Sequence, residues 1–125
     1  MYSIETSPEV VIQNSHQLVE FAKTFLGTPF SWEGFTCWDF VKKVYARFEI
    51  PMHVGSSIEP IADFDDPRAV GRLVLLRRRE YRGSRRYTHV AIYIGSRQVI
   101  HSTLYLGGMV VISTMEEVLA VYQIV

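Results

Sequence analysis

The chain has one cysteine, no net charge and no long apolar run, and each of these scarcities excludes a class of protein. A lone thiol, Cys37, forms neither an internal disulfide nor a four-cysteine zinc site. Thirteen basic and thirteen acidic side chains cancel, so charge indicates no nucleic-acid partner. No apolar run approaches the roughly 20 residues that span a bilayer. Residues 1–9 also lack the basic and apolar regions of a secretory signal.

The remaining composition is that of one folded domain. Apolar residues make up 48% of the 125 positions, which is enough to bury a core. We therefore expect a single domain over residues 1–125, with no membrane span and no nucleic-acid partner. The chain is expected to be soluble in the cytoplasm as synthesised, or to leave by lysis or by carriage on a larger assembly.

Two helices are predicted in the first half of the chain. Asn14 fits an N-cap, and Gly27 and Pro29 fit a helix end, so the first helix is expected over 15–26. A second apolar stripe begins at Cys37, and Pro51 ends this second helix. Residues 10–12, which precede the first helix, are expected to form a short strand or an arm that packs on the body of the domain.

The second half reads as short strands separated by turns. Helices followed by neighbouring strands predict an α+β fold with an antiparallel sheet. The expected strands are 73–76, 90–94, 99–101, 110–112 and 121–125, with one helical turn at 116–119. An arginine-rich segment, 77–86, is interpreted as a solvated hairpin tip, with contact to a polyanion or partner as the alternative.

Cys37 lies where a loop becomes a helix, and this position suits a nucleophile. The positive end of a helix dipole and a nearby imidazolium lower a thiol pKa, and free N–H groups there stabilise an oxyanion. A buried structural cysteine is the alternative. Position alone does not separate the two.

Two histidines lie in strand-like sequence beyond it. If a three-residue loop, Gly95 to Arg97, joins their strands, Ala91 faces His101 and both His89 and His101 lie on one face of the sheet. A two-residue loop would place them on opposite faces. Shared action therefore predicts an odd-numbered loop, with His89 taking the thiol proton and His101 orienting the His89 ring. A hydrogen-bonded strand histidine without catalytic role is the alternative for His89.

The other two histidines carry less information. His16 is expected to be exposed in a first helical turn, and His53 follows Pro51 in a loop. A Cys-His-His metal site lacks a nearby fourth ligand and matches no zinc spacing, so neither a metal nor another cofactor is expected.

Five stretches in order resemble the NlpC/P60 family of cell-wall peptidases, which have a papain-like fold. The similarity runs through residues 15–113. The matching residues are Phe25-Leu26-Gly27-Thr28-Pro29-Phe30-Ser31-Trp32-Glu33-Gly34, Cys37-Trp38-Asp39-Phe40-Val41 with Val44-Tyr45, Gly71-Arg72-Leu73-Val74-Leu75-Leu76, His89-Val90-Ala91-Ile92-Tyr93-Ile94-Gly95, and Ile100-His101-Ser102.

The resemblance implies a metal-free cysteine peptidase that cleaves amide bonds in peptidoglycan stem peptides through an acyl-enzyme. Cys37 resembles the family's nucleophile, His89 its general base and His101 its orienting residue. Substrate-binding residues are expected at Phe30, Trp32, Thr36 and Trp38. For the aromatic three, plain packing is the alternative.

The chain departs from the family pattern beside the cysteine. The family's Asp-Cys-Ser-Gly is Thr36-Cys37-Trp38-Asp39 here, its loop tyrosine is Phe30, and one glycine of Trp-Gly-Gly is Glu33. The aspartate, serine and tyrosine of the family often bind a free stem-peptide amine, so that specificity is not implied.

A tryptophan after the cysteine resembles the phage and prophage tail-associated branch, which predicts a tail-like assembly or other protein partner. A silent or binding component on the same fold, and a papain-like acyltransferase or deamidase, are the competing functions.

Overall fold

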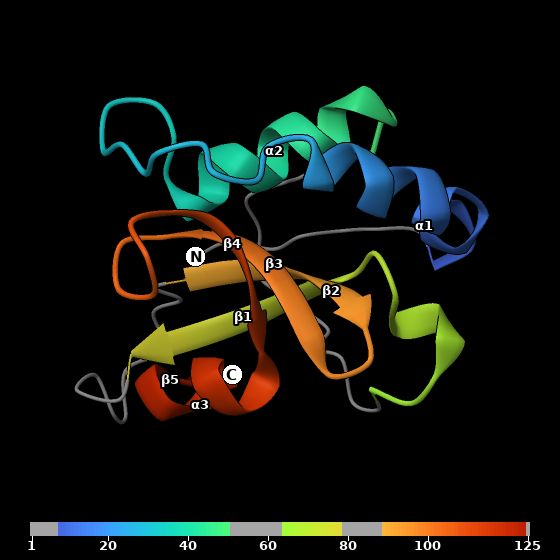
Figure 1. Cartoon of the computed structure of the whole chain (residues 1–125). Coiled ribbons are helices and arrows are strands. Elements are labelled where there is room, and N and C mark those ends of the chain that lie inside the picture. Colours follow the sequence, from blue (N-terminus) through green and yellow to red (C-terminus); the bar gives the residue numbers. More distant parts are fainter. Residues whose placement is uncertain (1–7, 51–63, 79–88, 125) are drawn as a thin grey trace.

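The computed structural model describes residues 8–50, 64–78 and 89–124. Its helices lie on both faces of an antiparallel sheet, which confirms the predicted α+β fold with N-terminal helices packed on a sheet (Figure 1). The arginine-rich segment beyond Arg78 and the loop containing His53 lie outside the described residues. The elements in chain order are α1 (Pro8–Lys23), α2 (Cys37–Arg47), the short 3-10 helix η1 (Pro67–Ala69), β1 (Leu73–Arg78), β2 (His89–Gly95), β3 (Gln98–Thr103), β4 (Met109–Thr114), α3 (Met115–Val121) and β5 (Tyr122–Ile124).

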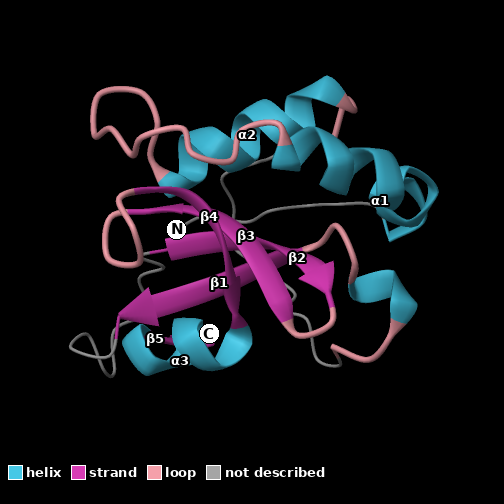
Figure 2. Ribbon diagram, viewed as in Figure 1, coloured by secondary structure: helices cyan, strands magenta, loops and turns pink. Residues whose placement is uncertain are grey.

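The described strands form one sheet in the order β4-β3-β2-β1-β5, with every neighbouring pair antiparallel. Helices α1 and α2 cover one face of this sheet, and α3 lies against the other (Figure 2). Strand residues alternate between the two cores: Val90 and Ile92 pack with the helices α1 and α2, while Ala91 and Tyr93 pack with α3. Because both faces are covered, the central strands are continuously buried.

Helix α1 differs from its prediction at both ends. It begins at Pro8 rather than at residue 15, so 10–12 is helical and Asn14 is not an N-cap. Proline suits the first turn of a helix because its missing N–H has no helical partner there. The regular helix ends at Lys23, and a tighter turn continues it to Leu26 through a Leu26 N to Lys23 O bond of 3.1 Å. Gly27 follows with φ +87°, as the end signal predicted.

The hairpin joining β2 to β3 has the predicted register but not the predicted loop. Ile92 pairs with Ile100 and Tyr93 with Val99, and this register continued by one residue places Ala91 opposite His101, as predicted. The turn itself has two residues, Ser96 and Arg97, both with positive φ. A β-bulge before Gly95 supplies the odd residue and restores the register.

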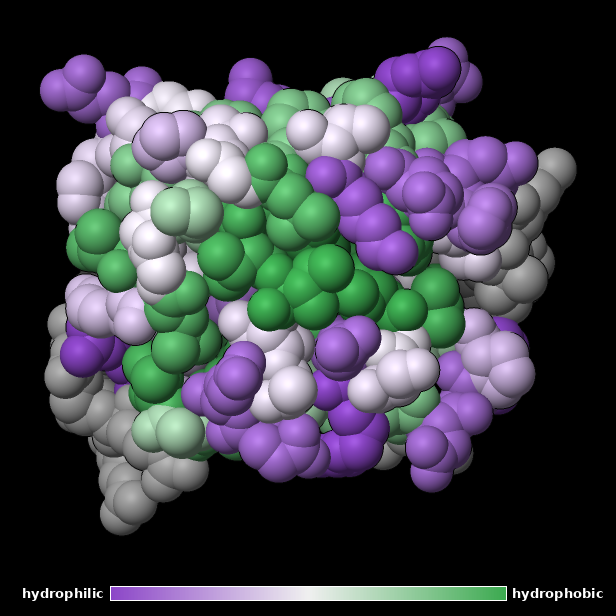
Figure 3. Space-filling view, viewed as in Figure 1, coloured by the Kyte–Doolittle hydropathy of each residue, from purple (hydrophilic) through white to green (hydrophobic). Residues whose placement is uncertain are grey.

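Apolar side chains also reach the surface. Figure 3 shows them gathered in the middle of one face of the molecule. Among the described residues, the exposed large apolar side chains are Leu26, Trp32, Leu104, Tyr105, Met109 and Ile112. None of the described helices is long and apolar enough to cross a membrane.

Candidate active site

Cys37 opens helix α2, and a capping box fixes it there. The Thr36 hydroxyl accepts a hydrogen bond from the Asp39 backbone N–H at 3.2 Å, and Asp39 Oδ2 accepts one from the Thr36 N–H at 3.0 Å. The Thr36 hydroxyl also donates to Asp39 Oδ2 at 2.9 Å. The Thr36 N–H bond is the main cause that lowers the pKa of Asp39. Thr36, which the sequence predicted to bind substrate, therefore already uses its hydroxyl to start the helix.

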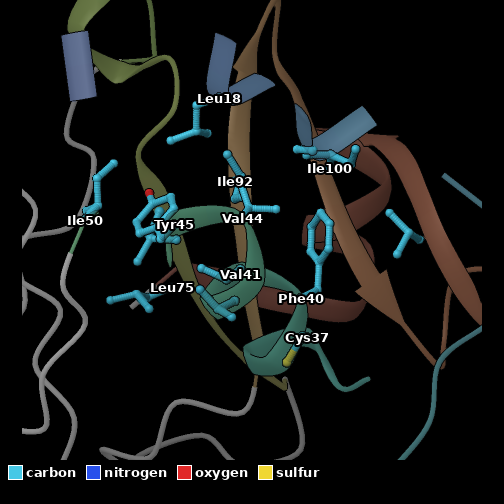
Figure 4. Packing of buried hydrophobic residues seen from close by; sticks show 14 residues of the cluster. Leu18, Cys37, Phe40, Val41, Val44, Tyr45, Ile50, Leu75, Ile92 and Ile100 are labelled. Atoms are coloured by element: carbon cyan, nitrogen blue, oxygen red, sulfur yellow. The ribbon is translucent and has the colours of Figure 1, made fainter. Parts of the chain in front are cut away.

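A second link holds the loop before Cys37 against the sheet. Ser102 on β3 donates its hydroxyl to the Phe35 carbonyl at 3.1 Å. Because Ser102 directly follows His101, this bond connects the loop before Cys37 to the strand that carries His101. Figure 4 shows Cys37 at the start of α2, at the margin of the core, with Phe40 one turn on and directed toward Ile100.

The Cys37 thiol is buried in the same core cluster as Val90 at the start of β2. Cys37 is 5% exposed, and the backbone N–H groups of Val90, Trp38 and Cys37 itself favour its thiolate form. Burial removes water from the charged form and raises the thiol pKa to about 11, although the three N–H groups oppose this rise. The N–H groups at the helix start lower this pKa, as expected, but desolvation is the larger effect and the net shift is upward.

The two histidines of β2 and β3 contact each other. His89 Nε2 lies 2.7 Å from His101 Nδ1, and both residues are buried. His101 Nε2 lies 2.9 Å from the Ser113 hydroxyl on β4. Three strands thus contribute one residue each to a continuous hydrogen-bonded row. These contacts use both ring nitrogens of His101 but only Nε2 of His89, so His89 Nδ1 lies outside the row.

Burial favours the neutral form of both imidazoles. Burial holds the pKa of His89 well below its usual range, and the neighbouring His101 lowers it further. Burial also lowers the pKa of His101 to about 4. Burial therefore disfavours both an imidazolium and a thiolate, and it favours a neutral thiol beside neutral rings.

Tyr122 on β5 packs flat against the His89 ring. Their ring centroids are 4.5 Å apart and the planes are 10° from parallel. Burial is the main cause that raises the pKa of Tyr122 to about 12, and the charge of Cys37 is a smaller cause in the same direction. Strand β5 therefore supplies a wall that limits how far the His89 ring can turn.

The sequence predicted Cys37, His89 and His101 as site residues, but it did not predict the contacts of Ser113 with His101 and of Tyr122 with His89. The alternation of β4 puts Val111 and Ser113 on the His101 side, which was a usable signal. The turn over residues 104–108 is longer than a standard hairpin turn, however, and its length does not determine how β4 pairs with β3. The register of β4 could therefore not be derived from the sequence. Tyr122 carried no signal, because the sequence did not indicate that β5 pairs with β1.

The aromatic residues predicted to bind substrate differ in their exposure. Trp32 is 71% exposed and meets Phe30 edge to face, with centroids 4.9 Å apart. Their loop is attached to β4 by a Phe30 N to Gly108 O bond of 2.9 Å and by pairing of Pro29 with Met109. Trp38 is half-buried and packs against the core. Trp32 is thus available to a ligand, whereas Trp38 contributes mainly to packing.

No group of three or more His, Cys, Asp and Glu side chains in the described part of the chain is arranged to hold a metal ion. Histidine His16 is exposed on α1, as expected. Cys37, His89 and His101 offer thiol and imidazole chemistry.

Helices on an antiparallel sheet, with a cysteine opening one helix and a histidine pair on adjoining strands, define a papain-like α+β domain. The sequence model of the NlpC/P60 family matches residues 27–123. The chain therefore belongs to the NlpC/P60 family. No curated protein sequence matches it significantly.

Solved structures show the same fold. NlpC1 from Trichomonas vaginalis is 21% identical with a TM-score of 0.69, over 89% of this chain and 42% of NlpC1. The NlpC/p60 domain of peptidoglycan hydrolase SagA is 22% identical with a TM-score of 0.58, over 83% of this chain and 92% of that domain. An NlpC/P60 family protein from Bacillus cereus ATCC 10987 is 24% identical with a TM-score of 0.56, over 90% of this chain and 36% of that protein. The chain therefore spans less than half of two of these three structures.

Proposed function

We propose that this chain is a cysteine peptidase that hydrolyses amide bonds in peptidoglycan stem peptides. One observation carries the proposal: the His89 and His101 rings are joined at 2.7 Å, while Val90, the next residue after His89, lies in the same buried cluster as Cys37. Membership of the NlpC/P60 family and the fold shared with peptidoglycan hydrolase SagA support the substrate class.

In the proposed reaction Cys37 attacks the amide carbonyl and its thiol proton passes to His89 Nδ1. The N–H groups at the start of α2 donate to the oxyanion that forms. His89 then gives the proton to the leaving amine, which leaves a thioester on Cys37, and water attacks that thioester with His89 as base. His101 holds the His89 ring in orientation throughout. Because thiol and imidazole are both neutral at rest, the proton moves as the sulfur attacks rather than beforehand.

Phe30 and Trp32 are proposed to form one wall of the substrate site, since they meet edge to face on a loop beside the start of α2. Thr36 and Trp38 act in this proposal through the helix cap and the core. Synthesis in the cytoplasm and delivery to the cell wall on a phage tail-like assembly stay predictions from the sequence.

The test is release of new amine and carboxyl termini from purified stem peptides. Wild type is expected to hydrolyse them, and Cys37→Ala is expected to lose at least a thousandfold in rate because the nucleophile is gone. Lys43→Ala changes an exposed residue of the same helix and serves as the matched control. Hydrolysis by Cys37→Ala at the wild-type rate would disprove the role of the thiol.

The burial of Cys37 favours one alternative, a binding component on the same fold. Reactivity toward alkylating agents at neutral pH does not separate the two functions, because burial raises the thiol pKa in either case. Analysis of the products separates these functions. Stem peptide that is bound but returned intact indicates a binding component, and transfer of its acyl group to an added amine indicates an acyltransferase.

A further inference from the structure

We propose that Ser113 is a positioning residue that decides which nitrogen of His89 carries the proton. By accepting a hydrogen bond from His101, the Ser113 hydroxyl keeps His89 Nδ1 free to take the thiol proton of Cys37. This inference rests on the proposed function, and it adds to it a residue of β4 that contacts neither the thiol nor a substrate.

The three polar groups lie in a row that excludes water. The row runs from His89 on β2 through His101 on β3 to Ser113 on β4, with contacts of 2.7 and 2.9 Å. His89 is 3%, His101 0% and Ser113 4% exposed. Water therefore does not compete for these groups, and each buried ring nitrogen in the row needs a partner within the protein.

A row of neutral groups allows two coherent directions of hydrogen bonding. In the first, His101 Nε2–H donates to Ser113, His89 Nε2–H donates to His101 Nδ1, and His89 Nδ1 carries a lone pair. In the second, Ser113 donates to His101 Nε2, His101 Nδ1–H donates to His89 Nε2, and His89 Nδ1 carries the hydrogen. Mixed arrangements put two hydrogens or two lone pairs against each other across the 2.7 Å contact.

Only the first direction leaves a base for the thiol. Neutral His89 with its hydrogen on Nδ1 cannot accept a second proton there. The direction of the row depends on its far end, where the Ser113 hydroxyl can accept from or donate to His101 Nε2, and the proposed reaction requires that it accept. Without an acceptor at this position, His101 Nε2–H would be buried and unpaired.

Removal of the hydroxyl is therefore expected to reverse the row. In Ser113→Ala, His101 avoids an unpaired N–H by placing its hydrogen on Nδ1, which points at His89. His89 must then move its hydrogen to Nδ1, and the free base form is lost. Ser113→Thr keeps a hydroxyl at the same position on a strand and is the conservative counterpart.

The tautomers can be measured directly by the ¹⁵N chemical shifts of the two rings at pH 7.5, with no substrate present. Wild type and Ser113→Thr are expected to show both hydrogens on Nε2, and Ser113→Ala to show them on Nδ1. In the kinetic arm, Ser113→Ala is expected to lose about tenfold to hundredfold in kcat with little change in KM, and Ser113→Thr to recover most of it. Ile112→Ala, on the same strand but facing the other way, is the control for a general loosening of β4.

Two results would overturn the proposal: wild-type rings with their hydrogens on Nδ1, or Ser113→Ala with unchanged tautomers. Loss of activity in Ser113→Thr equal to that in Ser113→Ala, with both variants folded, would also overturn it. The ring measurement needs no turnover. A wild type that hydrolyses no stem peptide therefore refutes the proposed function, while the tautomers still decide the role of Ser113.

Discussion

At the scale of single residues, two opposing effects act on the Cys37 thiol, and burial is the larger. A helix N-terminus stabilises an adjacent anion by about 0.3–1 kcal/mol. The shift of the thiol pKa from 9.0 to about 11 corresponds to about 3 kcal/mol in the other direction. The site therefore differs from one that stores a thiolate–imidazolium pair, and its base must be neutral and correctly oriented before the thiol can react.

This balance predicts how the thiol responds to pH. A group whose charged form is disfavoured by burial reacts only when pH approaches its raised pKa. We expect alkylation of folded Cys37 by iodoacetamide to be slow at pH 7 and to rise about tenfold per pH unit toward pH 11. The urea-unfolded chain is the control, and its rate should level off near pH 9. A rate for the folded protein that levels off below pH 8 would contradict the neutral resting site.

The residues of the candidate site were predictable to different degrees. Cys37 was identified because it was the lone thiol at a helix start, and His89 and His101 because a hairpin register relates them by simple arithmetic. Ser113 and Tyr122 depend on the register of β4 and on the partner of β5. These strand pairings join residues that are distant in the sequence, so a local sequence pattern does not predict them.

At the scale of elements, the start of α2 decides where the sulfur lies. Thr36 and Asp39 satisfy each other's backbone N–H groups, so the first turn of the helix is fixed at Cys37. The sulfur is thereby held against β2 at Val90.

Thr36→Ala is expected to lower the free energy of unfolding by about 1 kcal/mol, because it removes the cap of this helix. It should also lower peptide hydrolysis, since the first turn carries both the thiol and the N–H groups proposed to hold the oxyanion. Thr36→Ser keeps the capping hydroxyl and is the matched control. Urea unfolding followed by circular dichroism measures the first effect. Equal stability of Thr36→Ala and wild type would show that the cap does not hold the helix start.

Element boundaries were predicted where local chemistry decides them. Helix α2 begins at the predicted Cys37, and the predicted strands lie within one or two residues of β1 to β5. The start of α1 was missed because Asn14 resembles an N-cap, yet Pro8 starts the helix earlier. The hairpin loop was missed in detail, because a two-residue turn with a bulge gives the same register as a three-residue loop.

At the scale of the whole molecule, the histidine row lies inside a sheet that is covered on both faces. The fold stabilises its neutral groups and disfavours their charged forms. His101 has a pKa of about 4 in the folded chain against 6.5 when exposed, so the unfolded state binds more protons between these values. The contribution of His101 to the free energy of unfolding is therefore complete above pH 6.5 and is lost as pH falls toward 4. The Cys37 thiol gives the reverse dependence, with stability lost as pH rises from 9 toward 11.

We therefore expect the free energy of unfolding to fall on both sides of neutral pH. His101 alone should contribute a loss of about 3 kcal/mol between pH 6.5 and 4, at about 1.4 kcal/mol per pH unit. His101→Asn should flatten this acid slope, and Cys37→Ala should flatten the decline between pH 9 and 10. His16→Asn, which changes an exposed histidine, is the matched control. Urea unfolding at each pH measures all four proteins, and an acid slope that His101→Asn leaves unchanged would contradict a buried neutral ring.

The most direct test of the catalytic proposal is to trap the covalent intermediate on Cys37. Wild-type protein is mixed with purified stem peptide, quenched in acid within seconds, digested and analysed by mass spectrometry. The expected result is the acyl part of the substrate attached to the Cys37 peptide and released by hydroxylamine, as a thioester would be. Peptide hydrolysis without any adduct on Cys37, or an adduct on another residue, would contradict a Cys37 nucleophile.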